Sequence, residues 1–219
     1  MNKHIPVSIV TGRGPQDVLK FSNLLKLRGP QYCENGSSVV DSKTKEILEV
    51  SLIPDDLSHK IIREFKNSNL EYLVVSNGRT LINPKNALNN VSSLVLSSKE
   101  QGDLEKFVEK FEDLLNLNLL EFSTDENGNY FINIHNNPLG KAKAYDHFKK
   151  FYHLEPDNIF FIGDGVNDLS IINKCTNSIS MGNANERVKS NSKYITESVY
   201  NDGVPEAISK IILPRLKVY

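Results

Sequence analysis

A strand that runs directly into a glycine-flanked pair of carboxylates is the feature that most constrains how this chain folds. Residues 158–169 read NIFFIGDGVNDL, and Asp164 and Asp168 stand four positions apart just after the apolar run. A short apolar run without alternation is typical of a strand buried on both faces, as in a parallel sheet. Ligands of open α/β sheets bind beyond the carboxyl ends of the strands. The segment therefore predicts a fully buried strand with a polar site at its end.

The beginning of the chain shows the same order of strand, loop and helix. Residues 5–14, IPVSIVTGRG, are expected to form a strand closed by glycines, and the apolar residues of 14–29 recur at helical spacing. A second strand is expected in 30–41, with a turn at Asn35 and Gly36. A strand, a helix and a second strand of these lengths imply a parallel pair with a right-handed crossover.

The last third of the chain alternates in the same way. Helices are expected at 141–154, 168–175 and 203–213, and strands at 158–163, 178–182 and 193–198. Alternation of strands and helices indicates a parallel sheet covered by helices. We therefore expect an α/β fold in which residues 1–40 and 138–219 form one Rossmann-like sheet domain.

The middle of the chain, residues 41–137, has a different pattern. Strands are expected at 45–53, 92–98, 117–124 and 129–136, and helices at 54–67 and 102–115. The last two strands are joined by residues 125–128, DENG, which is a strong hairpin signal. Hairpin-like strands interrupted by helices indicate an α+β module inserted into the outer sheet domain.

Composition excludes several classes of protein. The formal net charge is -1 and the basic residues are scattered, so neither a nucleic acid nor an anionic membrane surface is expected as a partner. Apolar runs fall far short of the ~18 residues that span a bilayer. The two cysteines, Cys33 and Cys175, stand alone in their segments, which argues against a zinc cluster or a disulfide framework. We expect a cytoplasmic protein that acts as a monomer or homodimer.

Three polar segments fall at the expected strand ends: residues 11–14, 34–36 and 163–168. A threonine hydroxyl with glycine-flanked backbone N–H groups at a helix start, as at Thr11, forms a cradle for an anion such as phosphate. Two carboxylates in a glycine-bounded turn suit Mg²⁺, which takes one or two protein carboxylates and completes its shell with water and phosphate oxygens. The combination predicts phosphoryl chemistry.

Each of these signals also has a simpler explanation. Asp164 and Asp168 could cap the helix that follows them, because aspartate is a favoured N-cap residue. Turns like the one at Thr11 occur in many α/β proteins that bind no phosphate there. Asn35 and Asn183 sit in turns that a purely structural side-chain hydrogen bond would explain equally well.

The motifs taken in order resemble a known family. The segments are IPVSIVTGRG, ENGSSVVD, KAKAYDHF, FFIGDGVNDLSII, SISMGNANERVKSNSKYIT and NDGV. This series resembles the Cof-type branch of the haloacid dehalogenase superfamily of magnesium-dependent phosphatases. The resemblance covers both outer segments. Within that branch, the short insert and GKAKAYDHFKKFY are most similar in pattern to archaeal-type phosphoglycolate phosphatases, with sucrose phosphatases and mannosyl-phosphoglycerate phosphatases as neighbours.

The resemblance implies phosphate-binding roles for Thr11, Gly12, Arg13, Lys141 and Asn167. The Thr11 hydroxyl and the Gly12 amide would bind the phosphoryl group, with Arg13 beside them. Lys141 would correspond to the third-motif lysine, which neutralises charge shared by nucleophile and phosphate, and Lys143 is the alternative. Both lysines could instead be ordinary solvent-facing residues at a helix start.

The resemblance also implies the metal site. Asp164 and Asp168 match the fourth-motif acids, with Asp164 as a direct Mg²⁺ ligand and Asp168 as a second ligand or an orienting residue. Asn167 would assist in binding the phosphate. The five histidines show no metal-ligand spacing.

The insert corresponds to the family's cap domain, which recognises the part of the substrate beyond the phosphate. Arg79, in the segment Asn77-Gly78-Arg79, is a candidate for that role because arginine binds carboxylates through two parallel hydrogen bonds. A surface arginine without a ligand is the simpler explanation. The resemblance implies a small phosphate ester as substrate, either 2-phosphoglycolate or a sugar phosphate.

One family feature is absent from the sequence. The first motif, Asp-x-Asp at the end of a central strand, supplies the aspartyl nucleophile, the general acid and further metal ligands, and these 219 residues contain no Asp-x-Asp. We expect this to be the sequence of a phosphatase that is incomplete at its N-terminus, and the complete enzyme would work through an aspartyl-phosphate intermediate. A degenerate, non-catalytic homologue that binds a phosphorylated ligand or a partner is the second possibility. A strand supplied by another polypeptide is the third.

Overall fold

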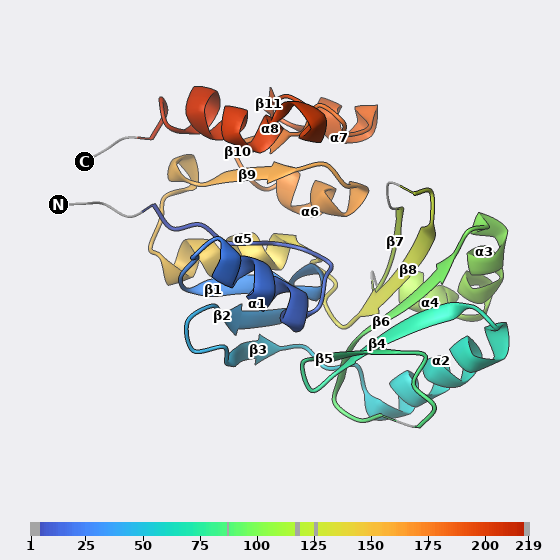
Figure 1. Ribbon diagram of the computed structural model, residues 1–219. Helices are drawn as coiled ribbons and strands as arrows, with labels where there is room; N and C mark the ends of the chain where they lie inside the picture. Colours follow the sequence, from blue (N-terminus) through green and yellow to red (C-terminus); the bar gives the residue numbers. More distant parts are fainter. Residues whose placement is uncertain (1–4, 87, 117–118, 125–126, 217–219) are drawn as a thin grey trace. The chain divides into compact units, whose positions relative to one another are not determined.

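The computed structural model, drawn in Figure 1, describes residues 5–86, 88–116, 119–124 and 127–216. The chain divides into two compact units. The first unit comprises residues 1–140 and the second comprises residues 141–219. His4 and the first two residues of the expected DENG turn lie outside the described residues. No helix in the described part of the chain is long and apolar enough to cross a bilayer.

The first unit begins with a helix and a small antiparallel sheet. Its elements are α1 Pro15–Leu24, β1 Pro30–Cys33, β2 Ser38–Asp41 and β3 Ile47–Val50, and the strand order is β1-β2-β3. The turn between β1 and β2 contains three successive residues with positive φ, namely Glu34, Asn35 and Gly36, at 51°, 53° and 86°. The expected turn at Asn35 and Gly36 is therefore present. Because β3 pairs with β2, the segment expected to open the insert continues the N-terminal hairpin instead.

The strand expected at residues 5–10 is wrong, because only Val10 forms a bridge, parallel to Tyr32. The parallel direction agrees with the predicted crossover. Pro30 has no backbone N–H to continue the ladder. The Ser8 hydroxyl donates to the Pro30 carbonyl at 2.7 Å, and the Ile9 N–H donates to the Gln31 side chain at 2.9 Å. Among the described residues, the backbone pairing of this segment with β1 is limited to Tyr32, whose N–H donates to the Ile9 carbonyl at 2.9 Å and whose carbonyl accepts the Thr11 N–H at 3.1 Å, and side-chain hydrogen bonds hold the residues before it.

The insert contains a five-stranded antiparallel sheet with strand order β5-β4-β6-β8-β7. The strands are β4 Glu71–Ser76, β5 Arg79–Ile82, β6 Val91–Ser98, β7 Leu120–Thr124 and β8 Tyr130–His135. The predicted β7–β8 hairpin is present. The β4–β5 hairpin was not predicted, although its two-residue loop is Asn77-Gly78 with φ of 49° and 72°. Asn-Gly is the preferred sequence of such a loop, so the signal was available.

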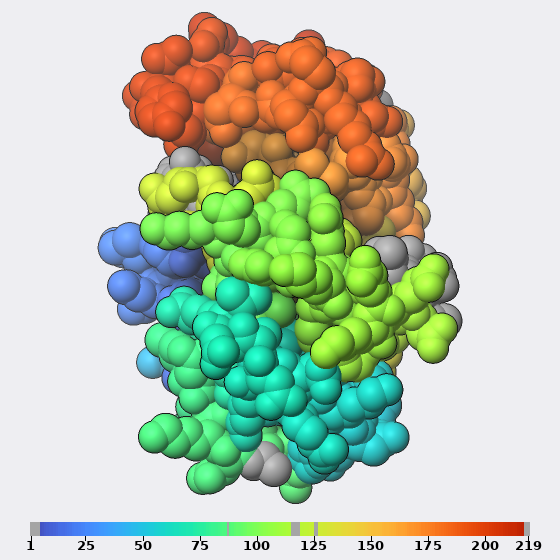
Figure 2. All heavy atoms as spheres, turned by 90° about the vertical axis from the view of Figure 1, so that its right-hand side faces the viewer, coloured from blue at the N-terminus to red at the C-terminus, as the bar shows by residue number. Residues whose placement is uncertain are grey.

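Three helices cover one face of this sheet: α2 Asp55–Ser68, α3 Gln101–Lys110 and α4 Glu112–Asn116 (Figure 1). In Figure 2 the cyan and green surfaces of α2 and α3 lie side by side. The buried rings of Phe65 on α2 and Phe107 on α3 pack together, with their centroids 5.0 Å apart. The single helix expected over 102–115 breaks at Phe111. That break buries the Phe111 ring against Phe107, with centroids 4.7 Å apart.

The second unit is built on a three-stranded parallel sheet with strand order β11-β10-β9. Its elements are α5 Ala142–Phe151, β9 Phe160–Gly163, α6 Leu169–Ile172, β10 Asn177–Ser180, α7 Glu186–Asn191, β11 Tyr194–Ile195 and α8 Gly203–Glu206. The expected order of helices and strands is therefore present. Together with the α+β insert, it confirms the predicted α/β fold class.

The predicted full burial of β9 is wrong, because all four of its residues are partly exposed whereas all four residues of β10 are buried. The cause is its position: among the residues that the structure describes, β9 is the edge strand of its sheet and pairs only with β10. In the described residues, moreover, the strands of the two chain ends form separate sheets instead of one. The family resemblance places the Asp-x-Asp strand in the middle of that single sheet, and this sequence lacks it.

The core of the insert provides the first prediction. Leu94 on β6 is fully buried among the apolar residues of the sheet and helices. We expect Leu94→Ala to lower the free energy of unfolding by about 3 kcal/mol, because it leaves a cavity that the packed helices cannot fill. Urea denaturation measures the change. The matched control, Ile82→Ala, alters a residue of the same sheet that is 67% exposed and should cost about 1 kcal/mol or less. Equal losses in the two variants would contradict the assigned core.

Candidate active site

The candidate phosphate-binding residues of the first unit lie in one loop, residues 11–14, which we call the glycine loop. It connects Val10 to the start of α1. Its backbone is tied to the end of β1 and the turn after it. The Thr11 N–H donates to the Tyr32 carbonyl at 3.1 Å, the Asn35 N–H donates to the Thr11 carbonyl at 3.0 Å, and the Glu34 N–H donates to the Arg13 carbonyl at 3.0 Å. These bonds fix the shape of the loop.

The side chains of the glycine loop differ in what they could bind. The Thr11 hydroxyl accepts the Arg13 N–H at 3.2 Å, which holds it inside the loop ahead of the helix start, where anions are favoured. The guanidinium of Arg13 is exposed and lies 3.6 Å from the Asp17 carboxylate, one turn along α1. Arg13 is therefore a surface ion-pair residue in this structure. Such exposed pairs contribute little energy and leave the arginine able to turn.

The insert reaches the glycine loop through the β4–β5 hairpin. A Cβ atom added to Gly14 would lie 2.7 Å from the hydroxyl oxygen of Thr80 and 3.6 Å from a methyl of Val75. The backbone of Gly14 can approach β4 and β5 this closely because glycine has no side chain. Arg79 is exposed and adjoins Thr80 in this hairpin. The predicted candidate Arg79 thus belongs to the element of the insert that contacts the glycine loop.

In the second unit, Asp168 is a hydrogen-bonding centre. Its Oδ1 accepts the Lys141 ammonium at 2.6 Å. Its Oδ2 accepts the backbone N–H groups of Asp164 and Gly165, each at 2.9 Å. The side chains of Lys141 and Asp168 are 7% and 6% exposed. The carboxylate therefore fixes both the predicted lysine and the turn that presents Asp164.

This geometry distinguishes between the explanations given for the acidic turn. Helix α6 begins after Asp168, yet neither oxygen of Asp168 caps it. The simple capping explanation thus does not describe Asp168. Lys141 is buried, so the explanation of an ordinary solvent-facing lysine is wrong for it. Lys143, the alternative, lies within α5 and is partly exposed.

Asp164 has the opposite environment from Asp168. It is exposed, and its Oδ2 accepts the side-chain amide of Asn183 at 3.0 Å. The Oδ1 of Asn183 in turn accepts the Val199 N–H at 3.0 Å, which orients the amide toward Asp164. Asn183 was singled out from the sequence only as a turn residue. Asn167 lies in the same turn as the two acids and is partly buried.

Gly163 allows the turn to close around Asp168. A Cβ atom added to Gly163 would lie 2.5 Å from Asp168 Oδ2, which is closer than such atoms can approach. Any larger residue would displace the carboxylate from the two backbone N–H groups. The glycine between strand and acids is therefore a requirement of the hydrogen-bond pattern.

Asp164 and the turn around it fit one part of a site for a hard cation such as Mg²⁺. No group of three or more histidine, cysteine, aspartate or glutamate side chains in the described residues could hold a metal ion. Mg²⁺ needs only one or two protein carboxylates when water and phosphate supply the rest of its shell. An exposed carboxylate held by an amide, as at Asp164, has the required chemistry. Asp168 already uses both oxygens, so its arrangement is that of an orienting residue.

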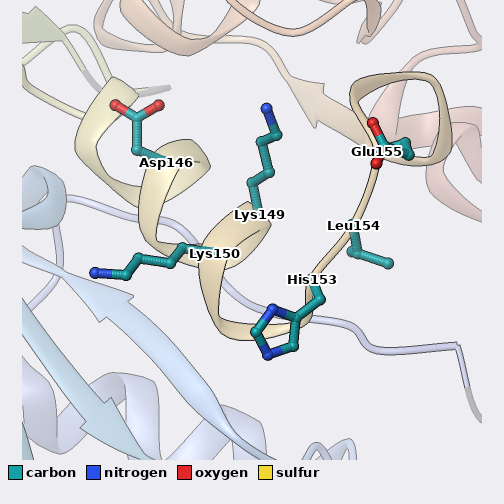
Figure 3. Close-up of a pocket in the computed structure, with 6 residues that line it drawn as sticks. All are labelled: Asp146, Lys149, Lys150, His153, Leu154 and Glu155. Atoms are coloured by element: carbon teal, nitrogen blue, oxygen red, sulfur yellow. The ribbon is translucent and has the colours of Figure 1, made fainter.

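A surface depression of about 460 Å³ in the second unit contains none of these residues. It lies at the end of α5, and its lining is Asp146, Lys149, Lys150, His153, Leu154 and Glu155. Their side chains point in different directions instead of toward a common centre (Figure 3). Ligand sites have convergent polar groups, so this depression is a poor candidate.

Comparison with known proteins identifies the family. The family model of haloacid dehalogenase-like hydrolases matches residues 1–93 and 82–208. A 5-amino-6-(5-phospho-D-ribitylamino)uracil phosphatase of Bacillus subtilis is 26% identical over 214 residues, which are 97% of this chain and 84% of the relative. A phosphoglycolate phosphatase of Methanobrevibacter smithii is 25% identical over 51% of this chain and 45% of its own length.

Solved structures share the fold. A haloacid dehalogenase-like hydrolase from B. subtilis superimposes with a TM-score of 0.77 at 16% identity, covering 94% of this chain and 88% of that one. One from Bacteroides thetaiotaomicron gives 0.75 at 20% identity, covering 94% and 86%. At these identities the similarity shows the fold alone. The family match over most of the chain shows more, and it confirms the resemblance seen in the motifs: this protein belongs to the haloacid dehalogenase-like hydrolases.

Proposed function

We propose that this chain carries the substrate-binding part of a magnesium-dependent phosphomonoester hydrolase that acts on a small phosphorylated metabolite. The observation that supports the proposal best is the buried ion pair of Lys141 and Asp168. It holds the lysine ammonium group at the base of the turn that contains Asp164. A buried charge pair is costly to form and gives little net stability, so a requirement of function explains it better. We further expect it to act in the cytoplasm, as a monomer or homodimer.

The residues have distinct roles in this proposal. By the family resemblance, the Thr11 hydroxyl and the Gly12 amide would bind phosphoryl oxygens. Lys141 has the role of a lysine that offsets charge during phosphoryl transfer. Asp164, oriented by Asn183, would hold Mg²⁺. The bound metal would supply the charge neutralisation that lysine alone cannot. Asn167 and Arg13 are secondary candidates for phosphate contacts. Asp168 would position Lys141 and the turn.

The chemical step needs an aspartate nucleophile, and these 219 residues contain no Asp-x-Asp. For that reason we propose the binding roles for this chain and the hydrolysis for a protein that also contains the motif. The absence favours one second candidate, a non-catalytic homologue that binds a phosphorylated ligand. Reading the coding sequence upstream of Met1 for an in-frame Asp-x-Asp, and then assaying a protein that contains it with an aryl phosphate and Mg²⁺, separates the two. Turnover supports the enzyme, and an upstream stop codon supports the binding protein.

Substrate choice is proposed to depend on the β4–β5 hairpin, because it contacts the glycine loop at Gly14. Arg79 at its turn would favour a substrate with a carboxylate next to the phosphate, such as 2-phosphoglycolate, over a neutral sugar phosphate. The similarity to a phosphoglycolate phosphatase supports the first class, and the similarity to a phosphatase of a phosphorylated ribitylamino compound supports the second.

The buried ion pair predicts a specific pattern of stabilities. We expect Lys141→Met to lower the free energy of unfolding by about 3 kcal/mol, because it leaves the Asp168 carboxylate buried without its cation. The double variant Lys141→Met, Asp168→Leu should recover most of that loss, since it removes both charges. Urea denaturation measures both. Lys143→Met is the control and should change stability by about 0.5 kcal/mol or less. A double variant as unstable as the single one would contradict the pairing.

The exposed acid predicts a change in metal binding without a change in folding. We expect Asp164→Asn to weaken Mg²⁺ binding about tenfold or more, because it removes the charge but keeps the shape of the side chain. Calorimetric titration with MgCl₂ measures the affinity, and thermal unfolding should be unchanged. Asp157→Asn, at another exposed aspartate of the same unit, is the control. Equal Mg²⁺ affinity in wild type and Asp164→Asn would refute the metal assignment.

A further inference from the structure

Glu34 is a buried acid that none of the roles above uses. It is 1% exposed and lies in the turn between β1 and β2 with a φ of 51°. Its carboxylate accepts the hydroxyl of Ser38, the first residue of β2, and the hydroxyl of Ser92 on β6 at 2.7 Å. The Ser92 contact joins residues 58 positions apart in the sequence. The side chain thus connects the N-terminal hairpin to the five-stranded sheet of the insert.

The backbone at the same place holds the glycine loop. The Glu34 N–H donates to the Arg13 carbonyl, and the N–H of the next residue, Asn35, donates to the Thr11 carbonyl, both at 3.0 Å. The Asn35 carbonyl accepts the buried side-chain amide of Asn137 at 2.8 Å, and the same amide group donates to the Gly140 carbonyl. The turn is therefore held by several hydrogen bonds. Its two donating N–H groups, those of Glu34 and Asn35, lie next to the Glu34 carboxylate that accepts the Ser92 hydroxyl on β6.

The conformation of Glu34 needs this support. A glutamate with φ near 50° is unfavourable because its Cβ crowds its own backbone, so the surroundings must hold it there. Residues kept in such conformations cluster at functional sites. Here the positive φ values of Glu34 and Asn35 point their successive N–H groups at the glycine loop, and the two serine hydroxyls hold the carboxylate that stabilises the turn.

The electrostatic surroundings of Glu34 are also unusual. Burial raises the pKa of its carboxyl, and the hydrogen bonds from Ser38 and Ser92 and the charge of His135 oppose part of that rise. His135 on β8 is itself buried, and its Nε2 lies 3.4 Å from the Glu121 carboxylate. Burial, and next the charge of Glu34, raises the pKa of the neighbouring Cys33 thiol. The acid is thus enclosed between the hairpin and the insert sheet.

We propose that Glu34 is a positioning residue that couples the shape of the glycine loop to the insert sheet through its hydrogen bond to Ser92. The inference rests on the proposed function in that the loop is taken to bind phosphate. A change at Ser92, on a strand of the insert, would then weaken the hydrogen bonds that the Glu34 and Asn35 N–H groups donate to the carbonyls of Arg13 and Thr11. The insert that recognises the substrate would in this way influence how well the loop binds the phosphate.

The experiment combines amide hydrogen exchange with calorimetric titration of inorganic phosphate. The variants are Glu34→Ala, Glu34→Gln, Ser92→Ala and the control Glu46→Gln, which changes an exposed glutamate in the turn between β2 and β3. Ser92→Ala removes the hydrogen bond to Glu34 together with a longer one, at 3.4 Å, to the Val75 carbonyl. We therefore expect the amides of Glu34 and Asn35 to exchange about fivefold faster and phosphate to bind about fivefold more weakly. Glu34→Ala should have a larger effect. Glu34→Gln keeps an acceptor and the shape, and should restore most of the protection.

Each outcome decides the question. Exchange at residues 34 and 35 that is unchanged in Ser92→Ala, within about twofold of wild type, would overturn the coupling whatever the phosphate affinity. If wild type binds no phosphate, the proposed function fails for this chain, and the exchange data still decide whether Ser92 controls the turn. If Glu34→Ala does not fold, Ser92→Ala supplies the test. A loss of protection in Glu34→Gln as large as in Glu34→Ala would also overturn the proposal, because a positioning acceptor must be replaceable by glutamine.

The pH dependence of stability gives an independent check. The pKa of Glu34 is raised in the folded state, so the folded protein keeps a proton that the unfolded chain releases between the ordinary glutamate pKa and the raised one. Stability from this residue is therefore present at low pH and is lost as pH rises through that window. Residue 34 cannot titrate in the Glu34→Gln variant. The free energy of unfolding of this variant, relative to that of wild type, should therefore increase as pH rises through the window. Urea midpoints measured across the window test this, and a constant difference would contradict the burial of an ionisable Glu34.

Discussion

The ion pair between Lys141 and Asp168 is the interaction on which the candidate site of the second unit depends. Lys141 precedes α5, Asp168 precedes α6, and their 2.6 Å contact fixes one relative to the other. The other oxygen of Asp168 accepts hydrogen bonds from the N–H groups of Asp164 and Gly165, so the same carboxylate fixes the turn after β9. Removing either charge would leave the other buried without an opposite charge, which costs several kcal/mol. The position of Asp164 is thus set by a residue that is itself hidden from solvent.

A comparable arrangement appears in the first unit. Glu34 is also a buried carboxylate that accepts hydrogen bonds from two directions, and its neighbouring backbone N–H groups also hold a loop at the end of a strand. In both units a residue that could meet a ligand lies in a loop held beside a buried acid: Thr11, which is partly exposed, and Asp164, which is exposed. A buried acid is rigid because its hydrogen bonds have no competition from water. Loops built this way keep their geometry without belonging to a helix or strand.

The sequence predicted the parts of the structure that depend on local pattern. The parallel order of the C-terminal elements, the helices of the insert and the β7–β8 hairpin follow from periodicity and turn residues, and all are present. The exposure of β9 could not be predicted from its apolar run, because burial depends on the strand beside it. The irregular path before Val10 depends on Pro30, twenty residues away, which is a tertiary effect. For the candidate site, spacing pointed to Asp164 and Asp168 without distinguishing them, and the family resemblance predicted Asp164 as the direct ligand and Asp168 as a second ligand or an orienting residue. Their separate environments arise from Lys141 and Asn183, which only the fold brings beside them.

That difference between two identical side chains decides what the turn can do. Asp168, buried and with both oxygens engaged, cannot take on a cation without giving up the lysine or the backbone that it holds. Asp164 is exposed and has an amide on one oxygen, so a cation can approach the carboxylate at little cost in desolvation. One aspartate of this chain would partly neutralise the charge of a metal ion bound there. Mg²⁺ would have to complete its octahedral shell with water, phosphate and any further carboxylates. In the function that we propose, the turn is one side of a metal site, and an Asp-x-Asp motif, which these residues lack, would supply the other side.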